Sequence, residues 1–168
     1  MGELVEELHA THQTLGLFTA SAAAGALSLG LLIPTMQGIA ATTETNGEPD
    51  VIVDVVGSQW RWDFSYQDTE IVGTGEISSV PELVLPVGAT VRFNLTSGDV
   101  IHSFWVPEFF YKRDLIPGET QSFDVDLGSE TGTFEGKCAE FCGLEHYSMQ
   151  FTLRIVSEGE FASWVAEQ

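Results

Sequence analysis

Basic residues are scarce in this 168-residue chain: six lysines and arginines stand against 25 acidic residues, and the formal net charge is −19. Nucleic acid is therefore disfavoured as a partner, because phosphate binding needs a basic face. Since the acidic residues are spread along the whole chain, they favour bulk solvation in a high-salt setting, and we predict a halophilic composition. The alternative is an acidic docking surface that attracts a basic partner over a distance. Molar salt would screen this attraction, because it shortens the Debye length to about 3 Å.

Lysine and arginine are absent from residues 1–50. This absence argues against a signal peptide with a basic n-region, and it removes the positive-inside rule as a guide to orientation. Residues 15–41 carry no charge of either sign, and this run exceeds the roughly 20 residues that a helix needs to cross a bilayer. We predict a transmembrane helix over 15–41 behind a polar N-terminal segment over 1–14. A cleaved signal peptide and a buried soluble helix are the alternatives.

No hydrophobic run of comparable length follows residue 41. Residues 42–50 are polar and contain turn formers, which indicates a linker. Beyond it, short stretches rich in Val, Phe and Thr alternate in character between Gly- and Pro-containing turns; the clearest are 51–56, 82–97, 120–127 and 149–156. This pattern predicts a mainly β domain over 51–168, built as an antiparallel sandwich or barrel. The final stretch, GEFASWVAEQ, is expected to form a short helix.

Sulfur and imidazole are also scarce, since the chain has two cysteines, three methionines and four histidines. Four of these side chains nevertheless fall within twelve residues, as Cys138, Cys142, His146 and Met149. Thiolate, imidazole and thioether together suit copper better than any hard cation. A disulfide, or two buried free thiols, would leave the histidine and methionine unexplained. Zinc is disfavoured because methionine is a poor zinc ligand, and a single blue-copper centre would leave one cysteine unused.

A further nitrogen ligand must come from elsewhere, and the remaining histidines are His9, His12 and His102. The first two precede the apolar run, whereas His102 follows a strand-like stretch, where the end of a loop can present it. The donor set then comprises two thiolates, two imidazoles and one thioether. Two copper ions bridged by both thiolates would use all of these groups. Such a centre transfers electrons, because the protein fills every coordination position and leaves none for a substrate.

Three segments, DVIHSFWVPEF, KRDLIPGET and CAEFCGLEHYSM, resemble subunit II of haem–copper cytochrome c oxidases, and the upstream GSQWRWDFSY extends the likeness. The resemblance implies a cupredoxin domain that carries the dinuclear copper A centre. It implies that Cys138 and Cys142 bridge the two coppers, while His102 and His146 bind one each. It further implies that Met149 is a weak ligand to one copper.

The resemblance gives Glu140 two roles: its backbone carbonyl would be a ligand to the other copper, and its side chain a ligand to a magnesium ion at the junction with subunit I. Trp60 matches the tryptophan through which family members accept electrons, although an aromatic residue in QWRW would also pack well in a core. Asp99 and Asp114 match acidic positions near the copper face, and both suit solvated turns equally well.

The implied function is that of the subunit through which electrons enter a respiratory terminal oxidase. A soluble donor, cytochrome c or a small blue copper protein, would reduce copper A, and the haem of subunit I would receive the electrons to reduce oxygen to water. The copper A subunit of a nitric oxide reductase and a membrane-anchored copper carrier are the alternatives. A single span resembles the B-type oxidases, whereas Glu140 and QWRW resemble the A-type, so the subtype stays open. We expect a single-pass cell-membrane protein with its copper domain outside and residues 1–14 in the cytoplasm.

Overall fold

The computed structural model describes residues 2–43, 45, 47–67, 69, 71–75, 80–109 and 111–168, which divide into a helical unit and a β unit. Some positions of the predicted segments lie outside the described residues. They are Met1 in the segment 1–14, Glu44 and Asn46 in the linker 42–50, and residues 68, 70, 76–79 and 110 in the domain 51–168.

The helical unit is one helix, α1 (Gly2–Thr43), with Pro34 inside it. The predicted span over 15–41 lies within α1, which also includes the polar residues 2–14. Of the described residues, only Leu15–Gly38 is long and apolar enough to cross a membrane, with 24 residues and a mean hydropathy of 1.8. Hydroxyl groups in this stretch donate to carbonyls one turn earlier, as from Thr19 to Leu15 at 3.0 Å and from Thr35 to Leu31 at 2.7 Å. These bonds give the hydroxyl groups partners within the helix, which a lipid environment would not supply.

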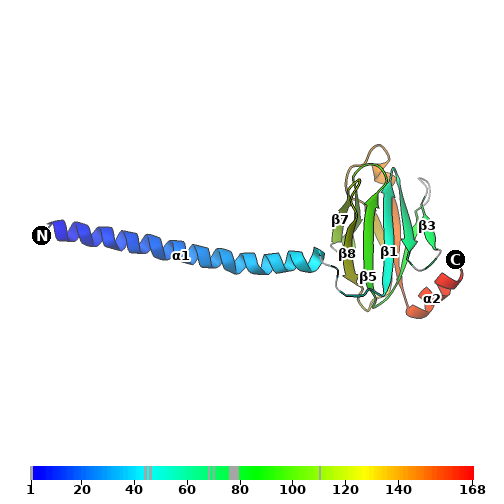
Figure 1. The fold of residues 1–168 in the computed structure, drawn as a ribbon, viewed down its shortest axis with the longest axis horizontal. Coiled ribbons are helices and arrows are strands. Elements are labelled where there is room, and N and C mark those ends of the chain that lie inside the picture. Colours follow the sequence, from blue (N-terminus) through cyan, green and yellow to red (C-terminus); the bar gives the residue numbers. More distant parts are fainter. Residues whose placement is uncertain are drawn as a thin grey trace. The chain divides into compact units, whose positions relative to one another are not determined.

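The β unit is a sandwich of two sheets, each with five strands in the described residues (Figure 1). One sheet has the order β3-β2-β1-β5-β8, formed by Val72–Thr74, Arg61–Tyr66, Val51–Ser58, Thr90–Ser97 and Gln121–Asp126. The other has the order β4-β10-β9-β6-β7, formed by Glu82–Pro86, Gln150–Val156, Gly132–Cys138, His102–Val106 and Tyr111–Leu115. Short 3-10 turns, η1 (Pro107–Phe109) and η2 (His146–Ser148), interrupt the connections.

The prediction of a mainly β sandwich preceded by one apolar helix is confirmed. The described strands pair antiparallel except for β1 with β5 and β10 with β4, which run parallel. Alternation of buried and exposed side chains cannot reveal these two parallel pairs, because it reports which face of a strand is buried and not the direction of its neighbour.

Aromatic side chains from both sheets fill the core beneath the predicted ligands. The rings of Phe104 and Phe151 stack with centroids 4.8 Å apart, and Trp62 meets Phe151 edge-on at 5.6 Å. Gly136 makes room for this packing, because a Cβ at that position would lie 2.0 Å from the Phe151 ring. The indole N–H of Trp62 donates to the backbone oxygen of Met149 at 3.4 Å. The core therefore supports the segment that carries the predicted metal ligands.

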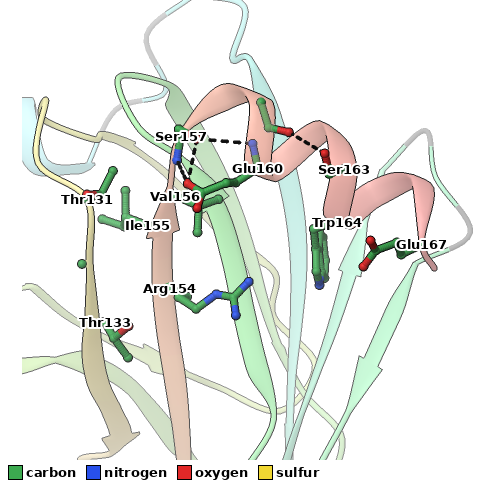
Figure 2. A pocket seen from close by; sticks show the side chains of 12 residues that line it. Thr131, Thr133, Arg154, Ile155, Val156, Ser157, Glu160, Ser163, Trp164 and Glu167 are labelled. Carbon is green, nitrogen blue, oxygen red and sulfur yellow. Dashed lines mark hydrogen bonds between the residues drawn. The ribbon is translucent and has the colours of Figure 1, made fainter.

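The predicted C-terminal helix is confirmed as α2 (Glu158–Ala166). Ser157 caps it, since its hydroxyl accepts from the Glu160 N–H while the Glu160 carboxylate accepts from the Ser157 N–H. A hollow of about 800 Å³ lies beside α2. Figure 2 shows the side chains that line it, Arg154 and Trp164 among them. The capping groups at the start of α2, Ser157 and Glu160, are partners of each other, and we assign no ligand to this hollow.

Tyr66 joins the two sheets at the free edge of β4. Its hydroxyl donates to the Val84 oxygen at 2.9 Å and accepts from the Val84 N–H at 2.8 Å. We expect Tyr66→Phe to lower the free energy of unfolding of the metal-free chain by about 2–4 kcal/mol, because it leaves two buried backbone groups unsatisfied. Denaturant unfolding measures this, with Tyr147→Phe as the control, since Tyr147 is 74% exposed. Equal stability of the two variants would contradict the bridging role.

Candidate metal centre

The loop between β9 and β10 brings four of the predicted ligands together. Cys138 ends β9, and Met149 directly precedes β10. The Cys138 N–H donates to the Met149 oxygen at 3.0 Å, which closes the loop at its base. Within it, the His146 N–H donates to the Gly143 oxygen at 3.2 Å and η2 begins. The four residues, which are close in sequence, thus lie in one closed loop.

The donor atoms of this loop converge on the Cys142 sulfur. It lies 3.9 Å from the Cys138 Sγ, 3.5 Å from the His146 Nδ1 and 3.8 Å from the Met149 Sδ. The two cysteines are free and buried, and their sulfurs are not bonded to each other. The disulfide alternative therefore does not describe this structure, in which both thiols remain available as ligands.

His102 completes the cluster from the neighbouring strand. It is the first residue of β6 and has no exposed surface. Its Nδ1 lies 3.9 Å from the Cys138 Sγ, and the ligand atoms of His102, Cys138 and Cys142 all fall within 4.8 Å of one another. His9 belongs to α1 of the helical unit, and its side chain lies outside those the structure describes. His102 thus stands where the loop after β5 ends and β6 begins.

The backbone carbonyl of Glu140 also lies beside the Cys138 sulfur. The Cys138 thiol donates to the Glu140 carbonyl oxygen at 3.2 Å, while the residue as a whole is exposed. This carbonyl oxygen is near enough to the Cys138 sulfur to reach a metal ion bound there, as the predicted copper contact requires. The magnesium contact of its side chain stays a prediction.

Protonation in the metal-free cluster is uneven. Burial, reinforced by the charge of Cys138, raises the pKa of the Cys142 thiol to about 12. Burial acts in the same direction on Cys138, but hydrogen bonds from His102 and the Ser103 backbone outweigh it and hold the pKa of Cys138 below its usual value. Burial would lower the pKa of His102, yet hydrogen bonds with Cys138 and Asp99 raise it above its ordinary value. A bound cation would take the place of these protons, because thiolate and neutral imidazole are the binding forms.

Trp60 lies beside the ligand loop, in the turn between β1 and β2. Its indole N–H donates to the Cys142 carbonyl oxygen at 3.2 Å, and its ring packs partly buried against the core. Gly143 permits this approach, since a Cβ there would lie 3.1 Å from the Trp60 nitrogen and the glycine adopts φ +124°. The structure therefore brings Trp60 to the ligand loop, although the two are about eighty residues apart in sequence.

The two acidic positions of the resemblance differ in their surroundings. The Asp99 Oδ1 lies 2.8 Å from the Nε2 of His102 and thus contacts this predicted ligand directly. Asp114 instead accepts from the Ser103 hydroxyl at 2.7 Å and from the Lys112 ammonium at 3.1 Å. These two contacts, the hydroxyl first, hold the pKa of Asp114 below its ordinary value. Asp99 is thus part of the site, and Asp114 belongs to a separate network between β6 and β7.

Sequence reasoning missed two features of the site. One is an apolar rim on the ligand loop, formed by Phe141, Leu144 and Tyr147, which are 76%, 85% and 74% exposed. The signal for it was three large apolar side chains interleaved with the predicted metal ligands in a loop. The other is Gln59, whose side chain donates to the Cys142 oxygen at 2.6 Å. Its only signal was its place next to Trp60.

The donor set fits a soft metal and the fold fits a small electron-transfer domain. Thiolate sulfurs, imidazole nitrogens and a thioether lie 3.5–3.9 Å from their neighbours, near enough to share metal ions between them. A β sandwich with a Cys–His–Met loop at one end and a histidine from an adjacent strand defines a cupredoxin-like metal domain.

Comparison with known proteins identifies the family. The model of the cytochrome c oxidase subunit II periplasmic domain matches residues 51–156. A probable cytochrome c oxidase subunit 2 of Streptomyces avermitilis is 40% identical over 148 residues, covering 66% of this chain and 46% of that protein. Cytochrome c oxidase subunit 2 of Thermostichus vulcanus is 41% identical over 133 residues, covering 78% and 38%.

A solved structure agrees with these relatives. The crystal structure of the periplasmic domain of cytochrome oxidase subunit II from Bradyrhizobium japonicum superposes with a TM-score of 0.64 at 34% identity, covering 73% of this chain and 96% of that one. The chain belongs to the cytochrome c oxidase subunit II family. It spans about half the length of the curated relatives it matches, or less.

Proposed function

We propose that the β unit is the domain through which electrons enter a respiratory terminal oxidase, and that it holds a dinuclear copper A centre. Its ligands would be Cys138 and Cys142 as bridges, His102 and His146 as terminal ligands, and Met149 and the Glu140 carbonyl as weak ligands. The observation that carries this proposal is the convergence of soft donors on Cys142 at 3.5–3.9 Å. When bound, the copper centre supplies reversible one-electron exchange.

The chain's own residues would keep this site rigid and dry. His102, Cys138, Cys142 and Met149 are at most 5% exposed, so water has little access to their donor atoms, while His146 is half-buried. His102 is held by β6 and Cys138 by the adjacent strand β9. The hydrogen bond between Cys138 and Met149 joins the two ends of the ligand loop. Ligands held in this way need little rearrangement when the charge of the site changes, which favours electron transfer over substrate chemistry.

We propose two protein partners for this domain. A haem-containing subunit I would receive the electrons, with magnesium bound at the junction through the exposed Glu140 side chain. A soluble donor, cytochrome c or a small blue copper protein, would deliver them at Trp60. The apolar rim of Phe141, Leu144 and Tyr147 supports an assembly, because monomeric proteins rarely leave several large apolar side chains together in water. Apolar contact also persists at a salt concentration that screens charge.

We further propose that α1 anchors the chain as a single-pass protein of the cell membrane, with the copper domain on the extracytoplasmic side. The family's matched domain is periplasmic by description, and Leu15–Gly38 has the length and hydropathy of a span. Gly, Ala, Ser and Thr dominate residues 16–30, which favours close packing against helices of a partner subunit.

The domain offers a direct test of the copper proposal. A fragment from about Asp50 onward is expected to fold without α1 and to turn purple with copper, because every proposed ligand lies after Val100. Its electron paramagnetic resonance spectrum should show one unpaired electron shared by two coppers. A spectrum from a single localised copper would rule out the dinuclear assignment. Purification of the native complex then tests the oxidase assignment, through the presence of a haem-containing subunit.

A further inference from the structure

Gln59 contacts both segments that carry the proposed copper ligands. It lies in the turn between β1 and β2, next to Trp60. Its side-chain Nε2 donates to the Cys142 carbonyl oxygen at 2.6 Å, a contact across 83 residues of sequence. Its backbone N–H donates to the Asp99 Oδ2 at 2.7 Å. One residue thus reaches the ligand loop with its side chain and the segment before β6 with its backbone.

Asp99 carries the second contact on to a ligand. Its other oxygen, Oδ1, lies 2.8 Å from the His102 Nε2, so the ring can donate a hydrogen bond there while Nδ1 faces the Cys138 sulfur at 3.9 Å. A histidine ligand whose second nitrogen is held in this way has a fixed ring orientation and a fixed tautomer. Gln59 is therefore linked to His102 through Asp99 and to Cys142 directly.

We infer that Gln59 is a positioning residue of the metal centre, which ties the Cys142 loop and the Asp99–His102 pair to one turn. This inference rests on the proposed copper site and adds a residue to it that binds no metal. Partners behind the ligands typically contribute ten- to a hundred-fold in metal affinity, because they hold the ligand atoms in the binding geometry.

The chemistry of the contact requires a neutral amide of this length. A carbonyl oxygen accepts hydrogen bonds, so a carboxylate in place of the amide would set two oxygens against each other. A shorter side chain would not reach the 2.6 Å contact. Gly143 leaves the space for it, since a Cβ at that position would lie 3.0 Å from the Gln59 Nε2.

The test uses the full chain in detergent, loaded with copper. Gln59→Glu keeps the shape of the side chain and removes its donor, while Gln59→Leu removes the donor without adding charge; both leave the backbone bond to Asp99 in place. Gln121→Glu is the matched control, because it makes the same substitution in β8, an edge strand of the sheet that contains β1 and β2. We expect both Gln59 variants to lose copper to a chelator about ten- to a hundred-fold faster than the control. Their copper hyperfine splitting and midpoint potential should also shift.

The outcomes separate this inference from the copper proposal. If the wild-type chain shows no shared-electron copper signal, the copper proposal fails. If the wild type shows it and both Gln59 variants match Gln121→Glu in copper loss, hyperfine splitting and potential, the positioning role is wrong. Should either variant fail to fold, hydrogen exchange of the Gln59 side-chain amide in the reduced wild-type protein decides. Protection of that amide supports the contact in the loaded site, and free exchange overturns it.

Discussion

Cys138→Ser and Cys142→Ser are each expected to abolish the shared-electron copper signal and to remove most of the bound copper. Each sulfur has several potential ligand atoms around it: Cys142 faces Cys138, His146 and Met149 within 3.9 Å, and Cys138 faces His102 at 3.9 Å. A serine oxygen is a hard donor and cannot replace a thiolate that bridges two soft copper ions. Metal analysis and electron paramagnetic resonance of the loaded chain measure both losses.

Met149→Leu is the matched comparison for these two variants. Its Sδ lies 3.8 Å from the Cys142 sulfur, and leucine preserves most of the volume of this 1% exposed side chain. Loss of a weak ligand should therefore leave copper bound while the midpoint potential and the distribution of the electron change. Equal copper loss in all three variants would contradict the weak-ligand role of Met149 and with it the division of roles in the cluster.

The local part of this site was predictable from the sequence for a physical reason. Cys138, Cys142, His146 and Met149 lie in one connection between two paired strands, so their spacing alone limits how far apart they can be. Val53 and Val55 show the same for the fold, because alternate burial along β1 leaves a period of two in the sequence. Features that depend on a single element leave a signal within that element.

The remaining part depends on contacts between distant segments. Gln59 reaches Cys142 across 83 residues, and no pattern near Gln59 indicates which backbone oxygen it will meet. The sequence points to His102 only through the need for a second nitrogen ligand and through the family resemblance. The pairing of β6 with β9 is what places it beside Cys138. The parallel pairing of β1 with β5 is of the same kind. Sandwich topology decides these contacts, and alternation does not encode topology.

Trp60→Phe is expected to slow reduction of the copper-loaded chain by its donor while copper content and spectrum stay unchanged. The indole N–H of Trp60 donates to the Cys142 oxygen at 3.2 Å, so this side chain links the protein surface to the ligand loop. Phenylalanine keeps an aromatic ring but loses that bond and part of the contact area. The rate constant should fall by about ten-fold or more, as at other interfaces where a tryptophan is a main anchor. Stopped-flow measurement of copper reduction gives this rate.

The copper spectrum should survive this change because Gln59 still holds the Cys142 oxygen at 2.6 Å when the Trp60 bond is lost. Trp164→Phe is the control, because Trp164 belongs to α2 and packs on Tyr66 of β2, with ring centroids 5.3 Å apart, and not on the ligand loop. A salt series separates the charge contribution to docking from the apolar one. Substitutions of acidic residues around Trp60 should alter the salt dependence of the rate, whereas Trp60→Phe should slow the reaction at every salt concentration. At molar salt the first effect should become small, because charges beyond about 3 Å are screened, and apolar contact then carries docking. A rate in Trp60→Phe equal to that of Trp164→Phe would leave Trp60 with a packing role alone.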